Sequence, residues 1–250
     1  MLEVSWEDKG LGRIPFKDPR NLSFMMAASP LLDSVSVLKK PTTWRMPGIP
    51  LDQGALPWCT EYSARHLLMG EPVRRSERTL PPYGDFYHMA QLVDAWPGED
   101  YDGTSVAAMV KILHKLGYIS EYRWSYTAEP VRVWIQEVSP VLFGIRWTRD
   151  MFYPEPSGLI HPTGEDRGGH AIICYRYDPR PVAWDPGYDH YWLYQSWGPL
   201  WGKDGRCCLR GTDVDALIRE GGEALSVREI PSAIKRLLIQ GRVDDSSQIG

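Results

Sequence analysis

The sequence lacks any apolar run close to the roughly 20 residues that a membrane-spanning helix requires. Its N-terminus, MLEVSWEDKGLGRIPF, has neither the basic start nor the apolar stretch of a secretory signal. The formal net charge of −4 gives no electrostatic reason to expect nucleic acid or an anionic membrane as a partner. These absences predict a soluble protein without a signal peptide, cytoplasmic in the cell that produces it.

Cysteine is also scarce, with four residues in a chain of 250. A secreted disulfide scaffold of this size would carry more, and the adjacent pair Cys207–Cys208 is poor geometry for a bridge between its own members. The chain has no CxxC or HxxxH spacing, so we expect no metal and no cofactor. We interpret Cys174, Cys207 and Cys208 as buried free thiols and treat Cys59 separately because of its context.

Apolar periodicity predicts three helices in the first half of the chain. They are expected at Cys59–Met69, at about Asp85–Trp96, and from a candidate cap at Thr104 to Gly117. The Pro-rich residues 1–50 show little periodicity, so the first 43 residues are predicted to form an extended arm.

The second half of the chain has segments typical of strands, separated by loops rich in Pro, Gly and Asp. The expected strands are Val141–Trp147, Ala171–Tyr177, Tyr191–Ser196 and Arg206–Leu209, and two short helices are expected at Thr212–Glu220, capped by Thr212, and at Pro231–Gln240. Helices that precede strands favour an α+β fold of two lobes over alternating βαβ units, with a site between the lobes.

A cysteine begins the first predicted helix, at the end of the segment Asp52–Thr60. At a helix N-terminus, the free backbone N–H groups and the helix dipole stabilise the thiolate of Cys59. Gln53, six residues earlier, can loop back so that its side-chain amide and the Cys59 N–H form an oxyanion hole. A buried cysteine that opens an amphipathic helix explains the segment equally well when it is taken alone.

Two further segments add to this one. In Arg167–Ile173, His170 begins an apolar strand after two glycines that allow another chain to approach closely. A histidine in that place is more often structural, but beside a helix-terminal cysteine it becomes a general base. In Tyr194–Gly205, two Trp-Gly pairs four residues apart suggest an aromatic shield over a hydrogen bond, although a Trp-rich core turn is the simpler explanation.

Together the three segments resemble the papain-like cysteine peptidases over about residues 44–210. The family pattern has Gln-Gly, Cys six residues after the Gln, a Gly-His-Ala strand, and Asn-Ser-Trp-Gly-x-x-Trp-Gly-x-x-Gly. This chain has Gln53-Gly54, Cys59, Gly169-His170-Ala171, and a last motif that begins at Gln195-Ser196-Trp197 and ends at Gly205.

The resemblance implies a papain-like two-lobe fold and a set of site residues. The fold would have a helical lobe at about 50–130, with its central helix starting at Cys59, and an antiparallel sheet or barrel lobe at about 131–230. The peptidase domain would cover 44–230, followed by a helix and tail at 231–250. Cys59 and His170 would be catalytic, Gln195 would orient the imidazole, and Gln53 would stabilise the oxyanion. Gly103, Gly169 and Trp197 are expected to contact the substrate backbone.

Several positions depart from the family pattern. The third catalytic residue, normally Asn, is Gln195, whose amide lies one methylene further out. Thr60 replaces the Trp that usually follows the nucleophile, and Leu56 replaces a disulfide cysteine, as suits a reducing compartment. No long helical propeptide precedes the domain, which makes the chain similar to short papain-like proteins of bacteria and tailed bacteriophages.

The sequence therefore predicts a cysteine-type peptidase that hydrolyses peptide or isopeptide bonds of a polypeptide substrate through a thiolate–imidazolium pair. Two alternatives stay open: a weakly active or inactive structural protein of a phage particle, hence virion-associated, and a cell-wall amidase or transferase with the same Cys–His site. Protein neighbours are expected through the N-terminal arm and the C-terminal tail. The arm, Met1–Lys40, is also a candidate autoinhibitor that covers the site.

Overall fold

The computed structural model describes residues 5–26, 40–98 and 100–228 of the chain. Its α-helices are α1 (Cys59–Met69), α2 (Asp85–Gln91), α3 (Val106–Lys115), α4 (Ala128–Glu137) and α5 (Gly211–Arg219). Its strands are β1 (Thr42–Thr43), β2 (Glu121–Ser125), β3 (Val141–Thr148), β4 (Asp166–Asp178), β5 (His190–Tyr194), β6 (Arg206–Arg210) and β7 (Glu223–Arg228). Short 3₁₀ turns occupy Trp6–Asp8, Pro19–Phe24, Glu77–Thr79 and Arg149–Phe152.

The strands form one antiparallel sheet in the order β2-β7-β3-β4-β5-β6, with β1 added beside β4. β4 is the longest strand and pairs with β3 over nearly its whole length, in a register that sets Ile145 opposite His170. From His170 to Cys174 every residue of β4 is buried, so both faces of this strand are covered. A strand buried on both faces reads as an apolar run, which is why the segment after His170 looks strand-like without polar alternation.

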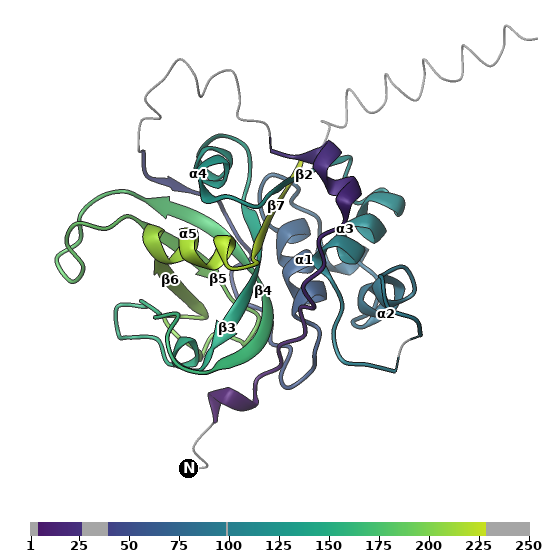
Figure 1. Cartoon of the computed structure of the whole chain (residues 1–250), viewed down its shortest axis with the longest axis horizontal. Helices are drawn as coiled ribbons and strands as arrows, with labels where there is room; N and C mark the ends of the chain where they lie inside the picture. The colour runs from purple at the N-terminus through teal and green to yellow at the C-terminus, as the bar shows by residue number, and fades with distance from the viewer. Residues whose placement is uncertain (1–4, 27–39, 99, 229–250) are drawn as a thin grey trace, which may run out of the picture.

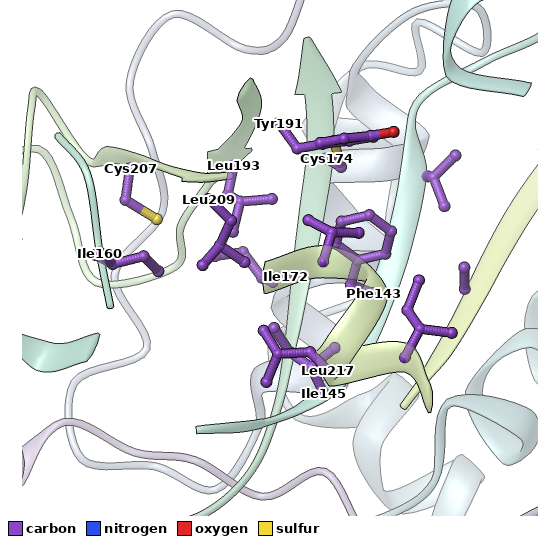
Figure 2. Close-up of a cluster of buried hydrophobic side chains, with 14 of the residues drawn as sticks. Phe143, Ile145, Ile160, Ile172, Cys174, Tyr191, Leu193, Cys207, Leu209 and Leu217 are labelled. Carbon is purple, nitrogen blue, oxygen red and sulfur yellow. The ribbon is translucent and has the colours of Figure 1, made fainter. Parts of the chain in front are cut away.

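Helices α1–α3 lie on one side of the sheet and α5 lies on the other (Figure 1). The sheet therefore separates two apolar clusters. One, packed against α1 and α3, includes Leu67, Met109 and Ile173. The other lies between the sheet and α5, and Figure 2 shows side chains of β3, β4, β5 and β6 in one cluster with Leu217 of α5.

The cysteines away from Cys59 lie in these interiors. Cys174 and Cys207 belong to the cluster of Figure 2, and Cys208 is equally buried on β6. All are free thiols, as predicted. Burial among apolar side chains raises the pKa of each thiol, so these residues behave as small core hydrophobes.

Helix α1 is buried on almost every side, including its polar residues. Glu61 and Arg65 form an ion pair at 2.8 Å with both side chains essentially inaccessible. The Glu61 carboxylate also accepts the backbone N–H groups of Gly84 and Tyr87, where α2 begins. This network fixes α2 to α1 and helps to hold the helix that carries Cys59.

The two-lobe α+β fold is confirmed, and several element boundaries change. The second helix ends at Gln91 rather than near Trp96, and Ser105, not Thr104, caps the third by accepting the N–H of Ala108 at 3.1 Å. The helix expected to be capped by Thr212 begins at Gly211 after Arg210. The strand expected to run from Tyr191 to Ser196 ends at Tyr194, and the strand with His170 begins earlier, at Asp166.

One α-helix and three strands were not expected from the sequence. They are α4, the two-residue β1, β2 and β7. Their pattern is weak because β2 is only half-buried over its first residues and α4 buries only three of its residues. β2 lies inside the range assigned to the helical lobe, yet it pairs with β7 in the sheet. The helix expected at Pro231–Gln240 and the tail after it lie outside the described residues, as do residues 1–4 and 27–39 of the arm.

Candidate active site

Cys59 is the first residue of α1, and its side chain is completely buried. The sulfur accepts the backbone N–H of Ala171 on β4 at 3.4 Å, which brings the helix start against the strand of His170. Backbone N–H groups of Ala171, Thr60 and Arg13 favour the thiolate, but burial is the larger effect and raises the pKa of Cys59 to about 12.

His170 is the residue before Ala171 and is also completely buried. Its Nε2 donates to Oε1 of Gln195 at 2.7 Å, whereas its Nδ1 has no hydrogen-bond partner among the described residues. A proton held on Nε2 leaves the Nδ1 lone pair free to accept one. Burial lowers the pKa of His170 to about 4, against the smaller opposing effect of the Gln195 hydrogen bond.

Gln195 thus makes the contact that the family's Asn would make. It follows the end of β5, and its backbone N–H donates to Gly205 at 3.0 Å. Its Oε1 accepts the backbone N–H of Ser196 at 2.8 Å in addition to the His170 ring. The extra methylene therefore does not prevent the amide oxygen from reaching the imidazole.

Ser196 connects this side of the site to Gln53. Its hydroxyl donates to Oε1 of Gln53 at 2.6 Å, and its carbonyl accepts the Gln53 backbone N–H at 2.9 Å. With Oε1 occupied, the amide Nε2 of Gln53 is directed to two carbonyl oxygens, Leu56 at 2.7 Å and Gly10 at 3.0 Å. Gly10 belongs to the N-terminal arm.

Aromatic rings surround the imidazole. The ring centroids of Trp147 and Trp197 lie 4.9 Å and 5.0 Å from that of His170, and Phe152 stacks on Trp197 at 5.2 Å. This cluster excludes water from the bond between His170 and Gln195, as expected from the Trp-Gly repeat. Trp197 has a second role, because its Nε1 donates to the carbonyl oxygen of Gly10 at 3.2 Å.

Residues Lys9–Ile14 of the arm cover the site, and we call them the covering segment. Figure 1 shows the N-terminal chain, in purple, passing α1 on its way to a 3₁₀ turn near α3. Gly10 donates to Gly54 at 2.9 Å, Gly12 and Arg13 both donate to the Gly169 carbonyl, at 3.2 Å and 3.0 Å, and Ile14 donates to Thr104 at 3.0 Å. The segment is thus bound as an extended peptide across the residues that flank Cys59 and His170.

The glycines of the covering segment and of its binding site allow this close approach. A Cβ on Gly10 would lie 1.9 Å from the carbonyl oxygen of Leu56, and one on Gly12 would lie 2.1 Å from that of Pro57. A Cβ on Gly169 would lie 2.0 Å from the Arg13 carbonyl oxygen, and one on Gly103 would lie 2.4 Å from that of Gly12. Both predicted substrate-contacting glycines therefore contact a peptide backbone, which here belongs to the chain itself.

The Gly103 loop differs in one detail from the expectation. The Gly103 N–H donates to the hydroxyl of Tyr87 at 2.7 Å, and Thr104 makes the backbone pairing with the covering segment, donating to Gly12 at 2.9 Å. Arg13 and Thr104 form a parallel bridge.

The sequence did not indicate Arg13 and Glu223, which form a buried ion pair at 3.0 Å beside the site. Nothing local marks Arg13, which stands in an arm without periodicity. The only sequence signal for the arm's role is the spacing Gly10-x-Gly12, which suits close contact with another backbone.

The charge state of the site also differs from the expected thiolate–imidazolium pair. With the pKa of Cys59 near 12 and that of His170 near 4, the thiol and the imidazole are both neutral at pH 7. The physical reason is desolvation by the covering segment and the aromatic cluster, which penalises both charged forms.

Among residues 5–26, 40–98 and 100–228, no cluster of three or more His, Cys, Asp or Glu side chains is arranged to hold a metal ion. No helix in that part of the chain is long and apolar enough to cross a bilayer.

Comparison with known proteins identifies the fold. No family model matches the sequence, and no curated protein matches it. The structure is similar to xylellain, a cysteine protease from Xylella fastidiosa, with a TM-score of 0.69 and 18% identity over 92% of this chain and 100% of the other.

Two further solved structures agree. Digestive procathepsin L 3 from Tenebrio molitor larval midgut has a TM-score of 0.57 and 15% identity over 89% of this chain and 77% of the other. The bromelain protease from Ananas comosus, solved with the E64 inhibitor, has a TM-score of 0.51 and 12% identity over 72% and 93%. The chain therefore has the papain-like cysteine peptidase fold, as its motifs predicted.

Proposed function

We propose that the chain is a cysteine-type peptidase, held latent by its own covering segment. The observation that carries the proposal is the arrangement of Cys59 and His170. Cys59 begins a buried helix, and its sulfur accepts a hydrogen bond from the backbone N–H of Ala171, the residue after His170. Nε2 of His170 donates to Gln195, which leaves Nδ1 free to accept a proton. Cys59, His170 and Gln195 thus supply a nucleophile, a base and a group that orients the base.

The reaction follows from these roles. Once a substrate replaces the covering segment, His170 Nδ1 accepts the Cys59 proton and the thiolate attacks the carbonyl carbon of the scissile bond. The imidazolium returns the proton to the leaving amine as the C–N bond breaks, and water then hydrolyses the thioester. Gln53 Nε2 and the Cys59 backbone N–H stabilise the oxyanion.

The contacts of Gly10 support the role of Gln53. Its carbonyl oxygen already accepts from Gln53 Nε2 and from Trp197 Nε1, so these donors hold a peptide carbonyl of the covering segment. The catalytic assignment of Cys59, His170, Gln195 and Gln53, and the substrate contacts of Gly103, Gly169 and Trp197, remain part of the proposal.

The hydrogen bond between His170 and Gln195 favours the peptidase over an inactive structural protein of a phage particle, because the amide oxygen of Gln195 reaches the imidazole despite its extra methylene. A cell-wall amidase or transferase would use the same acyl-enzyme step.

One experiment separates these functions. Full-length Gly10→Ala, in which the new Cβ would displace the covering segment, is incubated with casein and separately with peptidoglycan fragments, beside a Gly10→Ala/Cys59→Ala control. Cleavage of casein that the control lacks supports the peptidase. Cleavage of peptidoglycan fragments alone favours the amidase, and no cleavage of either by a folded protein with a labelled Cys59 contradicts the proposal in favour of a structural role.

A further inference from the structure

A cavity of about 350 Å³ lies on the sheet, away from the candidate active site. Residues of β4 and β5, and of the segments before and at the start of β6, line it, whereas Cys59, His170 and Gln195 do not. His190 begins β5 and lines the cavity, while Gln195 follows the other end of that strand. We call it the His190 cavity. Small-molecule sites occupy about 300–1,000 Å³, so its size suits a small ligand separate from the peptidase substrate.

His190 is held in place by a buried chain of charged groups. Its Nε2 donates to Oδ2 of Asp185 at 2.8 Å, and Arg210 donates to both oxygens of Asp185, at 2.7 Å and 2.8 Å. Only 1% of His190 is exposed, and its Nδ1 has no hydrogen-bond partner among the described residues. Asp185, which takes Nε2, does not line the cavity, so Nδ1 is the ring nitrogen left for a ligand. With the proton on Nε2, Nδ1 is an acceptor and requires a ligand that donates.

The cavity also presents positive charge. Lys203 and Arg206 line it, and neither forms an ion pair with another described residue. Lys203 lies over the ring of Trp192, 5.9 Å from its centroid. The third cation of the lining, Arg176, is already paired with Asp178 at 2.6 Å. An anionic group on the ligand is therefore favoured at Lys203 and Arg206, where its hydrogen bonds are charge-assisted.

The rest of the lining calls for more than an anion. The Asp204 carboxylate lines the cavity as a second acceptor beside Nδ1 of His190. Trp184 covers the His190 ring at a centroid distance of 4.8 Å, yet 43% of it is exposed, so part of its flat apolar surface is open to a ligand. Hydroxyl groups donate to both acceptors, and the C–H face of a sugar ring packs on an indole. A free inorganic anion or an aryl acid would leave Nδ1 without a donor.

We propose that the His190 cavity binds an acidic sugar, a pyranose that carries a phosphate or a carboxylate group. The anionic group lies at Lys203 and Arg206, a hydroxyl donates to Nδ1 of His190, and the ring packs on Trp184. The inference does not rest on the proposed function, because no residue of the candidate active site takes part.

Binding is measured by calorimetric titration of the full-length wild-type protein. The probes are glucose 6-phosphate and glucuronate. Glucose is the control for the ring without charge, and phenyl phosphate is the control for an anion without hydroxyls. We expect at least one acidic sugar to bind at least about tenfold tighter than either control. Tighter binding of glucose 6-phosphate assigns a phosphate to the ligand, tighter binding of glucuronate assigns a carboxylate, and both support the inference.

Variants locate the binding in the cavity. Lys203→Ala should weaken binding of the acidic sugar about tenfold, whereas Lys115→Ala, which removes another exposed lysine, on α3, should leave it unchanged. His190→Phe should remove the advantage of the sugar over phenyl phosphate. If that buried variant does not fold, Lys203→Ala still decides, because its side chain is exposed. The inference is overturned if neither acidic sugar binds, if phenyl phosphate binds as tightly, or if Lys203→Ala binds like wild type.

Discussion

The substitution Gly10→Ala tests the covering segment at its tightest contact. The new Cβ would lie 1.9 Å from the Leu56 carbonyl oxygen and 2.6 Å from its carbon. Both are backbone atoms, so no change of rotamer relieves the clash. Gly10 is not among the glycines with positive φ, so alanine adds no backbone strain of its own. The substitution therefore changes the fit between segment and site and nothing else.

The magnitude follows from the contacts that Gly10 makes. Its N–H donates to Gly54, and its carbonyl oxygen accepts from Gln53 and Trp197. At about 1 kcal/mol net for each hydrogen bond, loss of all three weakens binding of the segment by about 3 kcal/mol. That free energy corresponds to a rise of roughly 150-fold in the ratio of uncovered to covered protein.

The assay is alkylation by iodoacetamide at pH 7, with each modified residue mapped by mass spectrometry. Cys59 of the variant should react roughly 100-fold faster than in wild type, with Cys174 and Cys207 as unreactive internal references. Gly48→Ala is the matched control, because nothing lies within 4 Å of a Cβ there. If Cys59 reacts equally fast in wild type and in a folded Gly10→Ala, the segment does not protect the nucleophile and the reasoning fails.

Three more predictions concern pH, the orienting amide and the core. Because burial lowers the pKa of His170 to about 4, the uncovered form binds the proton more readily, so the covered form is favoured above pH 6.5 and loses stability relative to the uncovered form as the pH falls toward 4. Alkylation of Cys59 in wild type should thus stay nearly constant between pH 7 and 5, because the gain in uncovered protein offsets the loss of thiolate; a fall of about tenfold per pH unit, as for an ordinary thiol, would contradict this. In the uncovered background, Gln195→Ala should lower kcat/KM about 100-fold by freeing the imidazole tautomer, while Gln195→Asn retains part of the rate; equal rates for Ala and wild type would exclude an orienting role. Glu61→Ala leaves Arg65 buried without its partner and should lower the free energy of unfolding, measured in urea, by about 3–5 kcal/mol. Asp215→Ala, in the exposed pair with Arg219, should lower it by under about 1 kcal/mol. Similar losses in the two variants would show that the buried network contributes little.

The motifs predicted which residues lie close together around Cys59, because the proposed chemistry needs particular residue types in a fixed order. Cys59 at a helix start, His170 on an apolar strand, and Gln195 before the Trp-Gly repeat lie together with Gln53 in one region. Whether Gln195 could reach the imidazole depended on a difference of one methylene, which only the coordinates could decide.

The boundary errors share a cause. The helix predicted to reach Trp96 ends at Gln91, although Met89, Ala90 and Val93 fit its apolar period. Val93 is 39% exposed, so the apolar periodicity of the sequence extends past the last residues that pack against the core. β7 was missed because its first residue, Glu223, is a charge buried against a partner 210 residues away.

By itself the sequence determined most of the helices and strands, the buried free thiols, and the residue types at the proposed catalytic positions, because periodicity and motif spacing are local properties. Only the tertiary structure decided what lies on the nucleophile. Arg13 carries no local signal, and the spacing Gly10-x-Gly12 does not tell which backbone the glycines contact. The roles of Gly10 and Arg13 arise from contacts with Leu56, Gly169 and Glu223, residues distant in the chain that folding brings close to them. The same proximity sets the charge of the site, since burial is a property of the assembled fold.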